Sequence, residues 1–451
     1  PIAKSMWVST FHSACVRILR QEAHRLGYSN NFTIYDSSDS QRLIALVARD
    51  LNLDPKRYPP RLFAAMISNA KNELLGPADY LNSTTNQFEQ ITADVYSLYQ
   101  KRLTQANAMD FDDLIMKTVE VIQRYPEAKS RLRSRFRHIL VDEYQDTNHA
   151  QYILVKELVG KDEEGITAAE LCVVGDADQS IYGFRGATIR NILQFELDYL
   201  DAETILLEQN YRSTQNILSA ANAVIEKNQD RKAKNLWSEA GAGASLIGYV
   251  AESEHDEAEF IAGEIKRLSA DGTSKYGDTA IFYRTNAQSR VFEEVFMRSG
   301  LPYKVVGGVR FYERREIKDF VAYLKVLVNQ TDEVSLRRII NVPKRGIGDR
   351  AIESIESVAN SRGISFWQAL NVVANSSELG GRATASLSNF VSLILALNVL
   401  VEAGTKPSTI LEAVLEQSGL LAELQNSTDP QDESRVENLQ ELVAVAMEYE
   451  E

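Results

Sequence analysis

The ten residues 139–148, Ile-Leu-Val-Asp-Glu-Tyr-Gln-Asp-Thr-Asn, constrain the fold more than any other part of this chain. Their apolar start predicts a short buried strand, so that Asp142 and Glu143 follow at its carboxyl end. In an open α/β sheet, ligands bind just beyond the carboxyl ends of the strands. There, one carboxylate can hold Mg²⁺ while its neighbour polarises the water that attacks a γ-phosphate. For an isolated Asp-Glu pair, a buried strand with a solvated acidic turn would be the better interpretation.

Two further blocks of the same kind favour a site. Residues 171–175 form an apolar run that leads into residues 176–187, and residues 204–207 lead into residues 208–214. Each run ends in polar residues that include a Gln or an Arg suited to phosphate contact. Three such strand ends within about seventy-five residues predict one site on one sheet of an α/β fold.

These blocks resemble motifs II, III and IV of the UvrD/PcrA/Rep branch of superfamily-one DNA helicases nearly residue for residue. Residues 9–13, Ser-Thr-Phe-His-Ser, resemble that family's motif Ib. The resemblance implies an α/β fold with two incomplete RecA-like parallel-sheet motor domains, 1A and 2A, and two helical insertions, 1B and 2B. The implied divisions are 1–27 and 107–210 for 1A, 28–106 for 1B, 211–331 for 2A, and 332–451 for an incomplete 2B.

The implied cofactors are ATP and Mg²⁺. Asp142 is the predicted Mg²⁺ ligand, acting through water, because a hard cation favours carboxylate oxygens. Glu143 is the predicted general base that orients the attacking water. The resemblance makes Gln179 the residue that senses the γ-phosphate, Arg212 the cation that stabilises the transferring phosphoryl group, and Tyr211 the ring stacked on adenine. Two alternatives stay open: Gln179 as a turn-stabilising amide, and Tyr211 as a core residue.

Single-stranded DNA binding needs flat side chains for base stacking and donors for phosphates. Tyr182 and Phe184 are two residues apart and would lie on one side of an extended loop, with Arg185 beside them. Many relatives have Trp where this chain has Phe184. A second candidate group is Thr10, Phe11 and His12. His12 is explained almost equally well as a helix N-terminal residue without a ligand.

Residues 342–352, Val-Pro-Lys-Arg-Gly-Ile-Gly-Asp-Arg-Ala-Ile, resemble a helix-hairpin-helix turn. Glycines let the backbone approach a ligand closely, and amides at the start of the next helix can meet a duplex phosphate. The predicted duplex contacts are Lys344, Arg345, Gly346, Ile347 and Gly348. A plain glycine-containing connection between helices explains the pattern equally well.

The N-terminal half is predicted to contain a strand end and a helix over residues 8–26, closed by Gly27. Residues 28–106 are predicted to be wholly helical, and Phe88, Ile91, Val95 and Leu98 have the spacing of one apolar helix face. Residues 107–114, Asn-Ala-Met-Asp-Phe-Asp-Asp-Leu, also resemble a family block. We interpret their carboxylates as a helix cap and assign them no catalytic role.

The C-terminal half is predicted to have strands at 244–250, 279–283 and 303–306, with a helix at 257–268 between the first two. From about residue 332 the pattern is helical to the end. The polar run at 425–433 predicts a flexible loop within it.

The net charge of −14 argues against a nonspecific polycation but allows a local basic groove. Cys15 and Cys172 are interpreted as buried free thiols, and their spacing suits no metal site. We find no signal peptide and no apolar run long enough to span a bilayer, and predict a cytoplasmic protein without a membrane partner.

The chain has no Gly-Lys-Thr or Gly-Lys-Ser string, with which a phosphate-binding P-loop ends. We therefore expect an interior segment of a longer 3′ to 5′ helicase that hydrolyses ATP poorly by itself. Its expected partners are single-stranded DNA, single/double-strand junctions, and repair or replication proteins. Two alternatives stay open: a helicase–nuclease subunit of the AddA/RecB kind, and a non-enzymatic DNA-binding protein.

Overall fold

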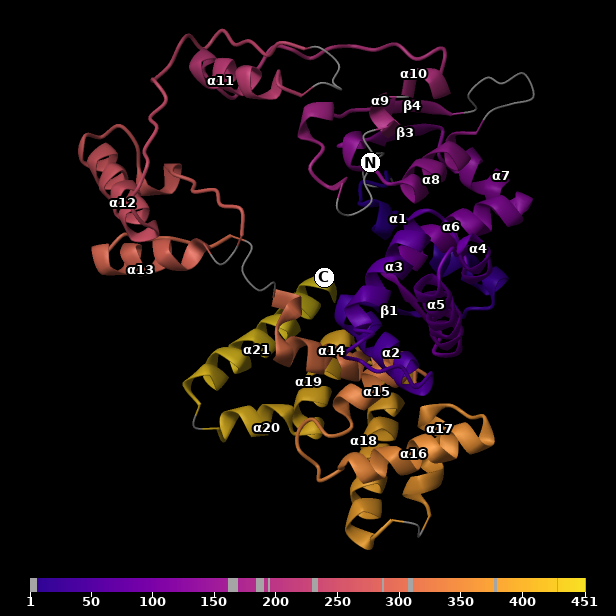
Figure 1. Ribbon diagram of the computed structural model, residues 1–451. Coiled ribbons are helices and arrows are strands. Elements are labelled where there is room, and N and C mark those ends of the chain that lie inside the picture. The colour runs from indigo at the N-terminus through magenta and orange to yellow at the C-terminus, as the bar shows by residue number, and fades with distance from the viewer. Residues whose placement is uncertain are drawn as a thin grey trace. The chain divides into compact units, whose positions relative to one another are not determined.

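The computed structural model describes residues 6–160, 169–183, 190–193, 195–228, 234–285, 288–306, 311–376, 379–427 and 429–450 (Figure 1). The chain divides into two compact units. Unit 1 consists of Pro1–Glu203 together with Arg315–Glu451, and unit 2 is Thr204–Arg314. Helices predominate, and the four strands assigned among the described residues form two small parallel sheets.

Unit 1 contains the helix predicted within residues 8–26, but the strand end predicted before it is wrong, because described residues 6–10 form no strand. Helix α1 (Phe11–Glu22) is capped by the Thr10 side chain and continues into a 3₁₀ turn, Ala23–Leu26, that Gly27 ends with φ +82°. The prediction that residues 28–106 are wholly helical is wrong, because β1 (Thr33–Tyr35) pairs in parallel with β2 (Ala108–Asp110). β-branched and aromatic side chains favour a half-buried strand at β1.

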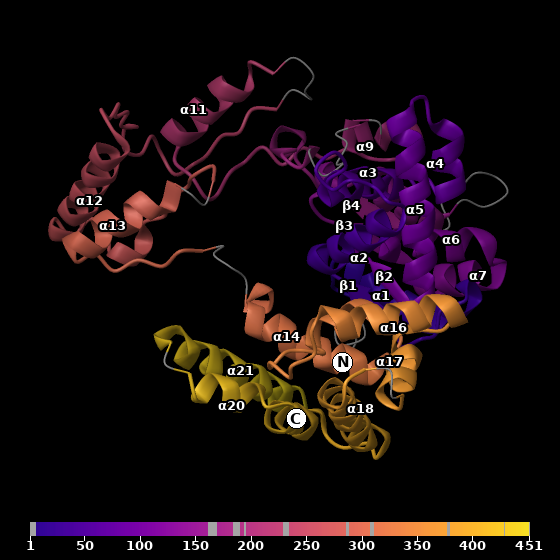
Figure 2. The same ribbon diagram turned by 60° about the horizontal axis from the view of Figure 1, so that its bottom comes forward.

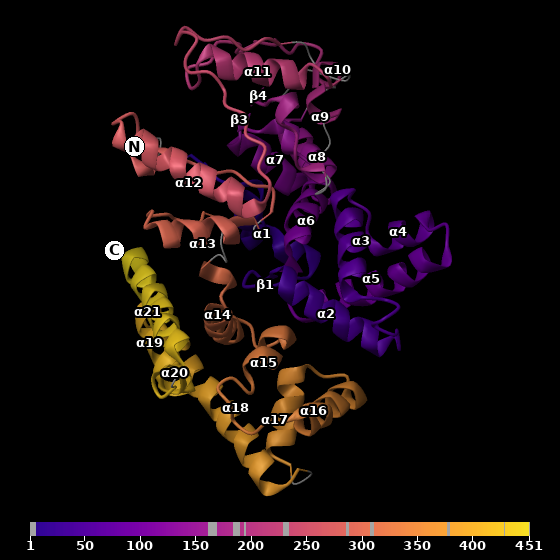
Figure 3. The ribbon, with the colours of Figure 1, turned by 60° about the vertical axis from the view of Figure 1, so that its left-hand side comes forward.

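Four helices follow β1: α2 (Ser37–Asp50), α3 (Pro60–Asn72), α4 (Pro77–Ser83) and α5 (Gln87–Gln105). Figure 3 shows α3, α4 and α5 close together. In α5, Val95 is fully buried, and Phe88, Ile91 and Leu98 pack against the same core, which confirms the predicted apolar face.

Helix α6 (Phe111–Arg124) begins with a capping box. The Asp110 carboxylate accepts the Asp113 N–H, and the Asp113 carboxylate accepts the Asp110 N–H, which confirms the predicted cap. The chain continues through α7 (Pro126–Arg135), β3 (His138–Val141), α8 (His149–Val159), β4 (Glu170–Val173), α9 (Arg190–Leu193) and α10 (Phe195–Asp198). Strands β3 and β4 pair in parallel, with Val141 opposite Val173.

The predicted strand at residues 204–207 is wrong, as are those at 244–250, 279–283 and 303–306, because none of these described segments is a strand. A strand must satisfy its backbone N–H and C=O groups with a neighbour. In unit 2 the bridge between Gln209 and Trp237 is the one such pairing among described residues. The apolar runs are exposed instead, as at Ile247 and Phe282.

Unit 2 is organised by helices α11 (Gln215–Ile225), α12 (Glu254–Ala270) and α13 (Ser289–Ser299). Helix α12 confirms the predicted helix at 257–268. Its small core joins α12 to α13 through Ala258, Ala262, Val295, Phe296 and Leu301.

Helix α14 (Arg315–Val328) begins the second segment of unit 1. From residue 332 onward the described chain is helical, as predicted. These helices are α15 (Glu333–Ile339), α16 (Asp349–Arg362), α17 (Phe366–Ala374), α18 (Gly381–Glu402), α19 (Pro407–Ser418), α20 (Leu420–Gln425) and α21 (Pro430–Glu450). The flexible loop predicted at 425–433 is too long, because α20 ends at Gln425 and α21 begins at Pro430.

The expectation that no apolar run is long enough to span a bilayer is wrong, because α18 is long and apolar enough to do so. Length and composition alone do not distinguish such a helix from the core helix of a soluble protein. In unit 1, α18 packs against α17, beside which it lies in Figure 2, and against α19. It buries Leu387, Phe390, Val391, Ile394 and Leu397.

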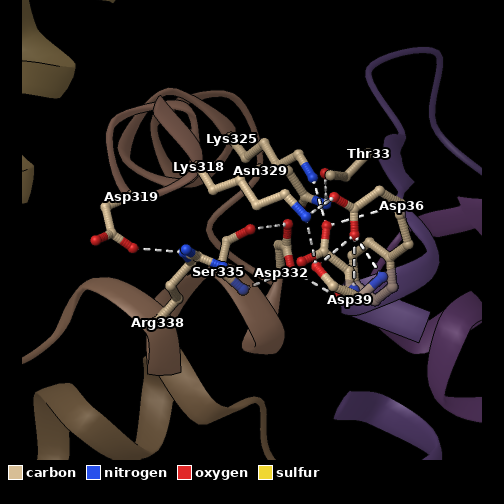
Figure 4. Close-up of polar contacts among 12 residues, drawn as sticks. Thr33, Asp36, Asp39, Lys318, Asp319, Lys325, Asn329, Asp332, Ser335 and Arg338 are labelled. Atoms are coloured by element: carbon tan, nitrogen blue, oxygen red, sulfur yellow. Dashed lines mark hydrogen bonds and ion pairs between the residues drawn. The ribbon is translucent and has the colours of Figure 1, made fainter. Parts of the chain in front are cut away.

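Buried polar contacts join the two sequence segments of unit 1 (Figure 4). The Tyr35 hydroxyl donates to Asp332 Oδ1 at 2.6 Å, and the Asn329 amide donates to Thr33 Oγ1 at 2.9 Å. Lys325 Nζ lies 2.8 Å from Asp39 Oδ2. The start of the C-terminal helical region is therefore anchored on β1 and the first turn of α2.

The two cysteines differ. Cys15 is buried, and burial raises the pKa of its thiol to about 12. Cys172 is exposed, so the prediction of a buried thiol is wrong there. Alternate side chains of a strand point to opposite faces, and Cys172 lies on the less covered face of β4.

Candidate functional site

The carboxyl ends of β3 and β4 lie side by side. The Val174 N–H donates to Val141 O at 2.8 Å, and the Tyr144 N–H donates to Val174 O at 2.9 Å. These bonds continue the ladder beyond the strands and bring residues 142–146 against residues 174–180. The first two predicted strand ends therefore meet at one edge, as expected.

Asp142 and Glu143 are both exposed at this edge. Asp142 Oδ1 accepts the Glu143 N–H at 3.0 Å. Glu143 has φ +51° and ψ +43°, a left-handed conformation that costs a residue with a Cβ about 1–3 kcal/mol. A backbone of this kind persists only where neighbouring contacts hold it.

Gln145 lies beneath the acidic pair and is 1% exposed. Its Nε2 donates to Glu143 Oε2 at 2.8 Å, and its Oε1 accepts the Asp176 N–H at 2.9 Å. Asp176 Oδ2 in turn accepts a hydrogen bond from Gln179 Nε2 at 2.7 Å. The structure therefore brings Asp142, Glu143 and Gln179 together.

Gln179 is exposed and lies in a 3₁₀ turn, Ala177–Gln179, which Asp176 caps by accepting the Asp178 N–H. Its side-chain amide contributes to this turn, as the open alternative proposed. A glutamine has two amide N–H donors and an oxygen that can accept. Holding the turn therefore leaves hydrogen-bonding capacity for a ligand.

Negative charge is concentrated at this edge. Burial raises the pKa of Asp146, and the nearby negative charge of Glu143 raises it further. One Asp146 oxygen is buried without a hydrogen-bond partner among the described residues. Adding a cation here would relieve repulsion between carboxylates.

The donor set suits Mg²⁺ shared with a phosphate. Among the described residues, no group of three or more His, Cys, Asp or Glu side chains is placed to hold a metal by itself. Mg²⁺ is commonly bound by one or two carboxylates, with water and substrate phosphates completing its shell. The exposed Asp142 carboxylate fits that pattern.

Two of the predicted DNA-contacting residues at the N-terminus have partners within the protein. Thr10 caps α1 by accepting the Ser13 N–H at 3.3 Å. The His12 ring lies 5.6 Å from the Phe111 ring, and burial lowers the pKa of His12. Phe11 is half-buried and packs against the cores on both sides of it. Thr10 alone of this group is exposed. The half-buried His12 ring therefore fits the alternative of a helix N-terminal residue without a ligand.

In the second DNA-contacting group, Tyr182 follows the β4 loop and is 37% exposed. Phe184 and Arg185 lie outside the described residues. Ring stacking at Tyr182 is therefore compatible with the structure.

Tyr211 and Arg212 belong to unit 2. Tyr211 is 85% exposed, which argues against core packing, and its hydroxyl donates to Gln209 Oε1 at 2.9 Å. Asn210 Oδ1 accepts the Arg212 N–H at 2.9 Å. Both side chains are accessible on their own unit.

In the turn between α15 and α16, some of the predicted DNA-contacting residues face solvent and others are directed into the protein. Arg345 is directed inward: its guanidinium donates to the carbonyls of Val342 and Ser418 and to the Tyr323 hydroxyl at 2.6–2.9 Å. Lys344 is exposed, and Gly346 has φ +75°. No acceptor for the N–H of Gly346 or Gly348 occurs among the described residues.

Ile347 is buried, and Asn341 Oδ1 accepts its N–H at 3.3 Å. Lys344 and the two glycine amides are therefore open to a ligand, whereas Arg345 and Ile347 shape the turn.

Gln145 and Gly175 were not predicted to belong to the site. A Cβ on Gly175 would lie 2.6 Å from Gln145 Oε1 and 3.1 Å from Tyr144 N, so a side chain there would displace the amide. The position of Gln145 two residues after Glu143 was the available signal, but its bond to Asp176 depends on the pairing of β3 with β4.

Comparison with known proteins agrees with this geometry. Residues 2–200 match the UvrD/REP helicase N-terminal domain, and residues 205–451 match the UvrD-like helicase C-terminal domain. ATP-dependent DNA helicase UvrD1 of Mycobacterium tuberculosis is 56% identical over 99% of this chain and 59% of its own length.

UvrD1 of Mycobacterium leprae is 53% identical over 99% of the chain and 58% of its own length. ATP-dependent DNA helicase PcrA of Staphylococcus aureus is 48% identical over 100% of the chain and 60% of its own length. The chain thus spans about three-fifths of the length of these relatives. Since the C-terminal domain alone matches more than half of its residues, the chain belongs to the UvrD-like helicase family.

Proposed function

We propose that this protein is an ATP-dependent DNA helicase that moves 3′ to 5′ along single-stranded DNA in the cytoplasm. The observation that carries the proposal is the exposed Asp142–Glu143 pair at the end of β3, beside the turn that contains Gln179. Its family membership and its identity to relatives named ATP-dependent DNA helicases support the proposal.

Phosphoryl transfer needs positioning and charge stabilisation more than covalent chemistry. Mg²⁺ held through Asp142 would neutralise charge on the phosphates. Glu143 orients the attacking water as general base, and Gln179 contacts the γ-phosphate. As the family resemblance implies, Arg212 stabilises the charge of the transferring group, and Tyr211 stacks on adenine.

DNA contacts are proposed at two places. Tyr182, Phe184 and Arg185, with Thr10, Phe11 and His12, form the single-strand group. Lys344 and the amides of Gly346 and Gly348 hold a duplex phosphate at a junction, where Arg345 and Ile347 maintain the turn. Repair or replication proteins are the proposed protein partners.

The proposed domains are RecA-like motors and helical insertions. Residues 1–27 and 107–210 belong to motor 1A, 28–106 to insertion 1B, 211–331 to motor 2A and 332–451 to insertion 2B. The pairing of β3 with β4 supports the assignment of 1A.

The test is ATP hydrolysis by the complete protein, with and without single-stranded DNA, beside Glu143→Gln. We expect DNA-stimulated turnover that falls by roughly 10²–10⁴-fold in the variant, the usual contribution of a general base. DNA-stimulated turnover that survives Glu143→Gln would contradict the proposed role of this strand end. The control is Glu127→Gln in the first turn of α7. It should leave turnover unchanged, because the Glu127 side chain is 85% exposed and is not part of the proposed site.

A further inference from the structure

The buried amide of Gln145 connects the acidic pair to the neighbouring turn. One end of the amide donates to the Glu143 carboxylate at 2.8 Å, and the other accepts the Asp176 N–H at 2.9 Å. A carboxylate can only accept and a backbone N–H can only donate, so this amide orientation is the one that satisfies both. Each end therefore holds a different strand end.

The space around this amide is closed. A Cβ added to Gly175 would approach Gln145 Oε1 to 2.6 Å and Ile192 Cδ1 to 2.9 Å. The backbone between β4 and the turn therefore passes close against the amide, and Gln145 has no room to adopt a second position without moving it.

The connection extends to the proposed phosphate sensor. Asp176 donates its N–H to Gln145 and accepts the Gln179 amide through Oδ2 at 2.7 Å. Hydrogen bonds thus run without a break from Glu143 through Gln145 and Asp176 to Gln179. A change at Gln179 can reach Glu143 through two residues.

We propose that Gln145 is a positioning residue that orients Glu143 and couples it to the turn carrying Gln179. The left-handed backbone of Glu143 needs neighbouring contacts to hold it, and within the described part of the chain the amide of Gln145 donates to its carboxylate. Contact of a ligand with Gln179 then changes how firmly the general base is held. This inference rests on the function proposed above.

The experiment compares kcat and KM for ATP in the complete protein and in Gln145→Met, which keeps the length of the side chain and removes both hydrogen bonds. Displacement of a catalytic group by about 1 Å can cost on the order of 100-fold. We expect kcat to fall by roughly 10–100-fold, with KM for ATP changed by less than about twofold, and DNA stimulation to be reduced.

Gln145→Glu separates the two ends of the amide. It can still accept the Asp176 N–H, but it replaces the donor that faces Glu143 with a second negative charge. We expect a loss of kcat at least as large as in Gln145→Met. Near-normal kcat in Gln145→Glu would overturn the proposed orientation of Glu143, because bracing of the turn alone would then suffice.

A double-mutant cycle distinguishes positioning from a structural role. Because Gln145 acts through Glu143, adding Gln145→Met to Glu143→Gln should cause little further loss in single-turnover hydrolysis. Full additivity of the two losses would overturn the inference. Gly175→Ala, which pushes on the amide from outside, should lower kcat in the same direction.

Gln100→Met is the matched control. Gln100 also donates its amide to a carboxylate, Asp113, at 3.2 Å, but belongs to the helical part of unit 1. It should leave kcat unchanged. If Glu143→Gln abolishes turnover and Gln145→Met does not, the proposed function stands and only the role of Gln145 fails.

Discussion

In unit 1, the carboxylates of Asp110 and Asp113 are closed off by a buried lysine, whereas those of Asp142 and Glu143 face solvent. Lys71 Nζ lies 2.7 Å from Asp110 Oδ2 and 3.0 Å from Asp113 Oδ1, and its side chain is fully buried. The Tyr99 hydroxyl also donates to Asp110 Oδ2 at 2.8 Å. The first acidic block begins at the last residue of β2, and the second directly follows β3.

The difference lies in where the balancing cation comes from. At the first block, helix α3 supplies it, and every carboxylate of the pair is committed to the cap of α6 or to Lys71. At the second block, the described partners of the acidic pair are a backbone N–H and a neutral amide. Paired carboxylates mark a ligand site only where the fold leaves their charge unbalanced.

The largest expected effect comes from removing the internal cation. Lys71→Met should lower the free energy of unfolding by about 3–5 kcal/mol, because it removes the cation that balances two buried carboxylates. Urea denaturation of this chain measures the change. Lys129→Met is the control: Lys129 Nζ lies 2.7 Å from Glu157 Oε2 but is 31% exposed, so its loss should cost about 1 kcal/mol or less.

Equal and small losses in both lysine variants would contradict the comparison, since the first block would then be no more committed than a surface ion pair. The same conclusion would follow if added salt abolished the difference in unfolding free energy between Lys71→Met and the unsubstituted chain. Salt screens exposed ion pairs far more than buried ones.

Features that depend on residues close together in the sequence could be predicted from the sequence. The cap at Asp110 follows from a spacing of three residues, and the acidic pair at Asp142 follows from the apolar run before it. Lys71 is 39 residues from Asp110, and no local pattern links it to that carboxylate. The turn at Gly346 was predicted, but the inward direction of Arg345 depends on Tyr323 and Ser418, far away in the sequence.

The strands that were predicted but are not formed have the same explanation. Residues 244–250 and 279–283 have β-favouring compositions, but a strand requires a partner, and neither segment has one among the described residues. Strand propensity measures how well a side chain fits a pleated, half-covered surface rather than a preference of the backbone alone. The same limit explains why β1 was missed inside a region of helical periodicity.

A smaller effect is expected from Asp142→Asn, which removes the carboxylate proposed to hold Mg²⁺. Loss of a group that holds a metal through water typically costs about 10–100-fold in metal affinity or activity. We expect ATP turnover by the complete protein to fall by this factor and to require more Mg²⁺ for half-maximal rate. Mg²⁺ titrations of the initial rate measure both quantities.

Asp113→Asn is the matched change at the closed block. It should lower stability while leaving the Mg²⁺ dependence of turnover unchanged at a temperature where the protein is folded. A shift in Mg²⁺ dependence in Asp113→Asn, or none in Asp142→Asn, would mean that the two blocks are not distinguished by access to an external cation.

The smallest expected effect concerns Asp112, which lies within the closed block. Burial, and next the negative charge of Asp110, raise its pKa to about 7 from an ordinary value of 3.8. Between these values the folded protein retains a proton that the unfolded chain has released. The free energy of unfolding therefore falls as pH rises from about 4 to 7, and the stabilising contribution present below pH 4 is absent above pH 7.

Asp112→Asn keeps a neutral side chain at every pH and should remove this decline. The gain over the unsubstituted chain should be on the order of 1 kcal/mol at pH 7.5 and close to zero at pH 4.5, less than the full shift implies because the side chain keeps some contact with water. Melting temperatures across this range measure it, with Asp79→Asn on the exposed side of α4 as the control. Parallel pH profiles for Asp112→Asn and the unsubstituted chain would contradict this prediction. They would show that the charge of Lys71 also balances Asp112, in addition to Asp110 and Asp113, which its Nζ contacts directly.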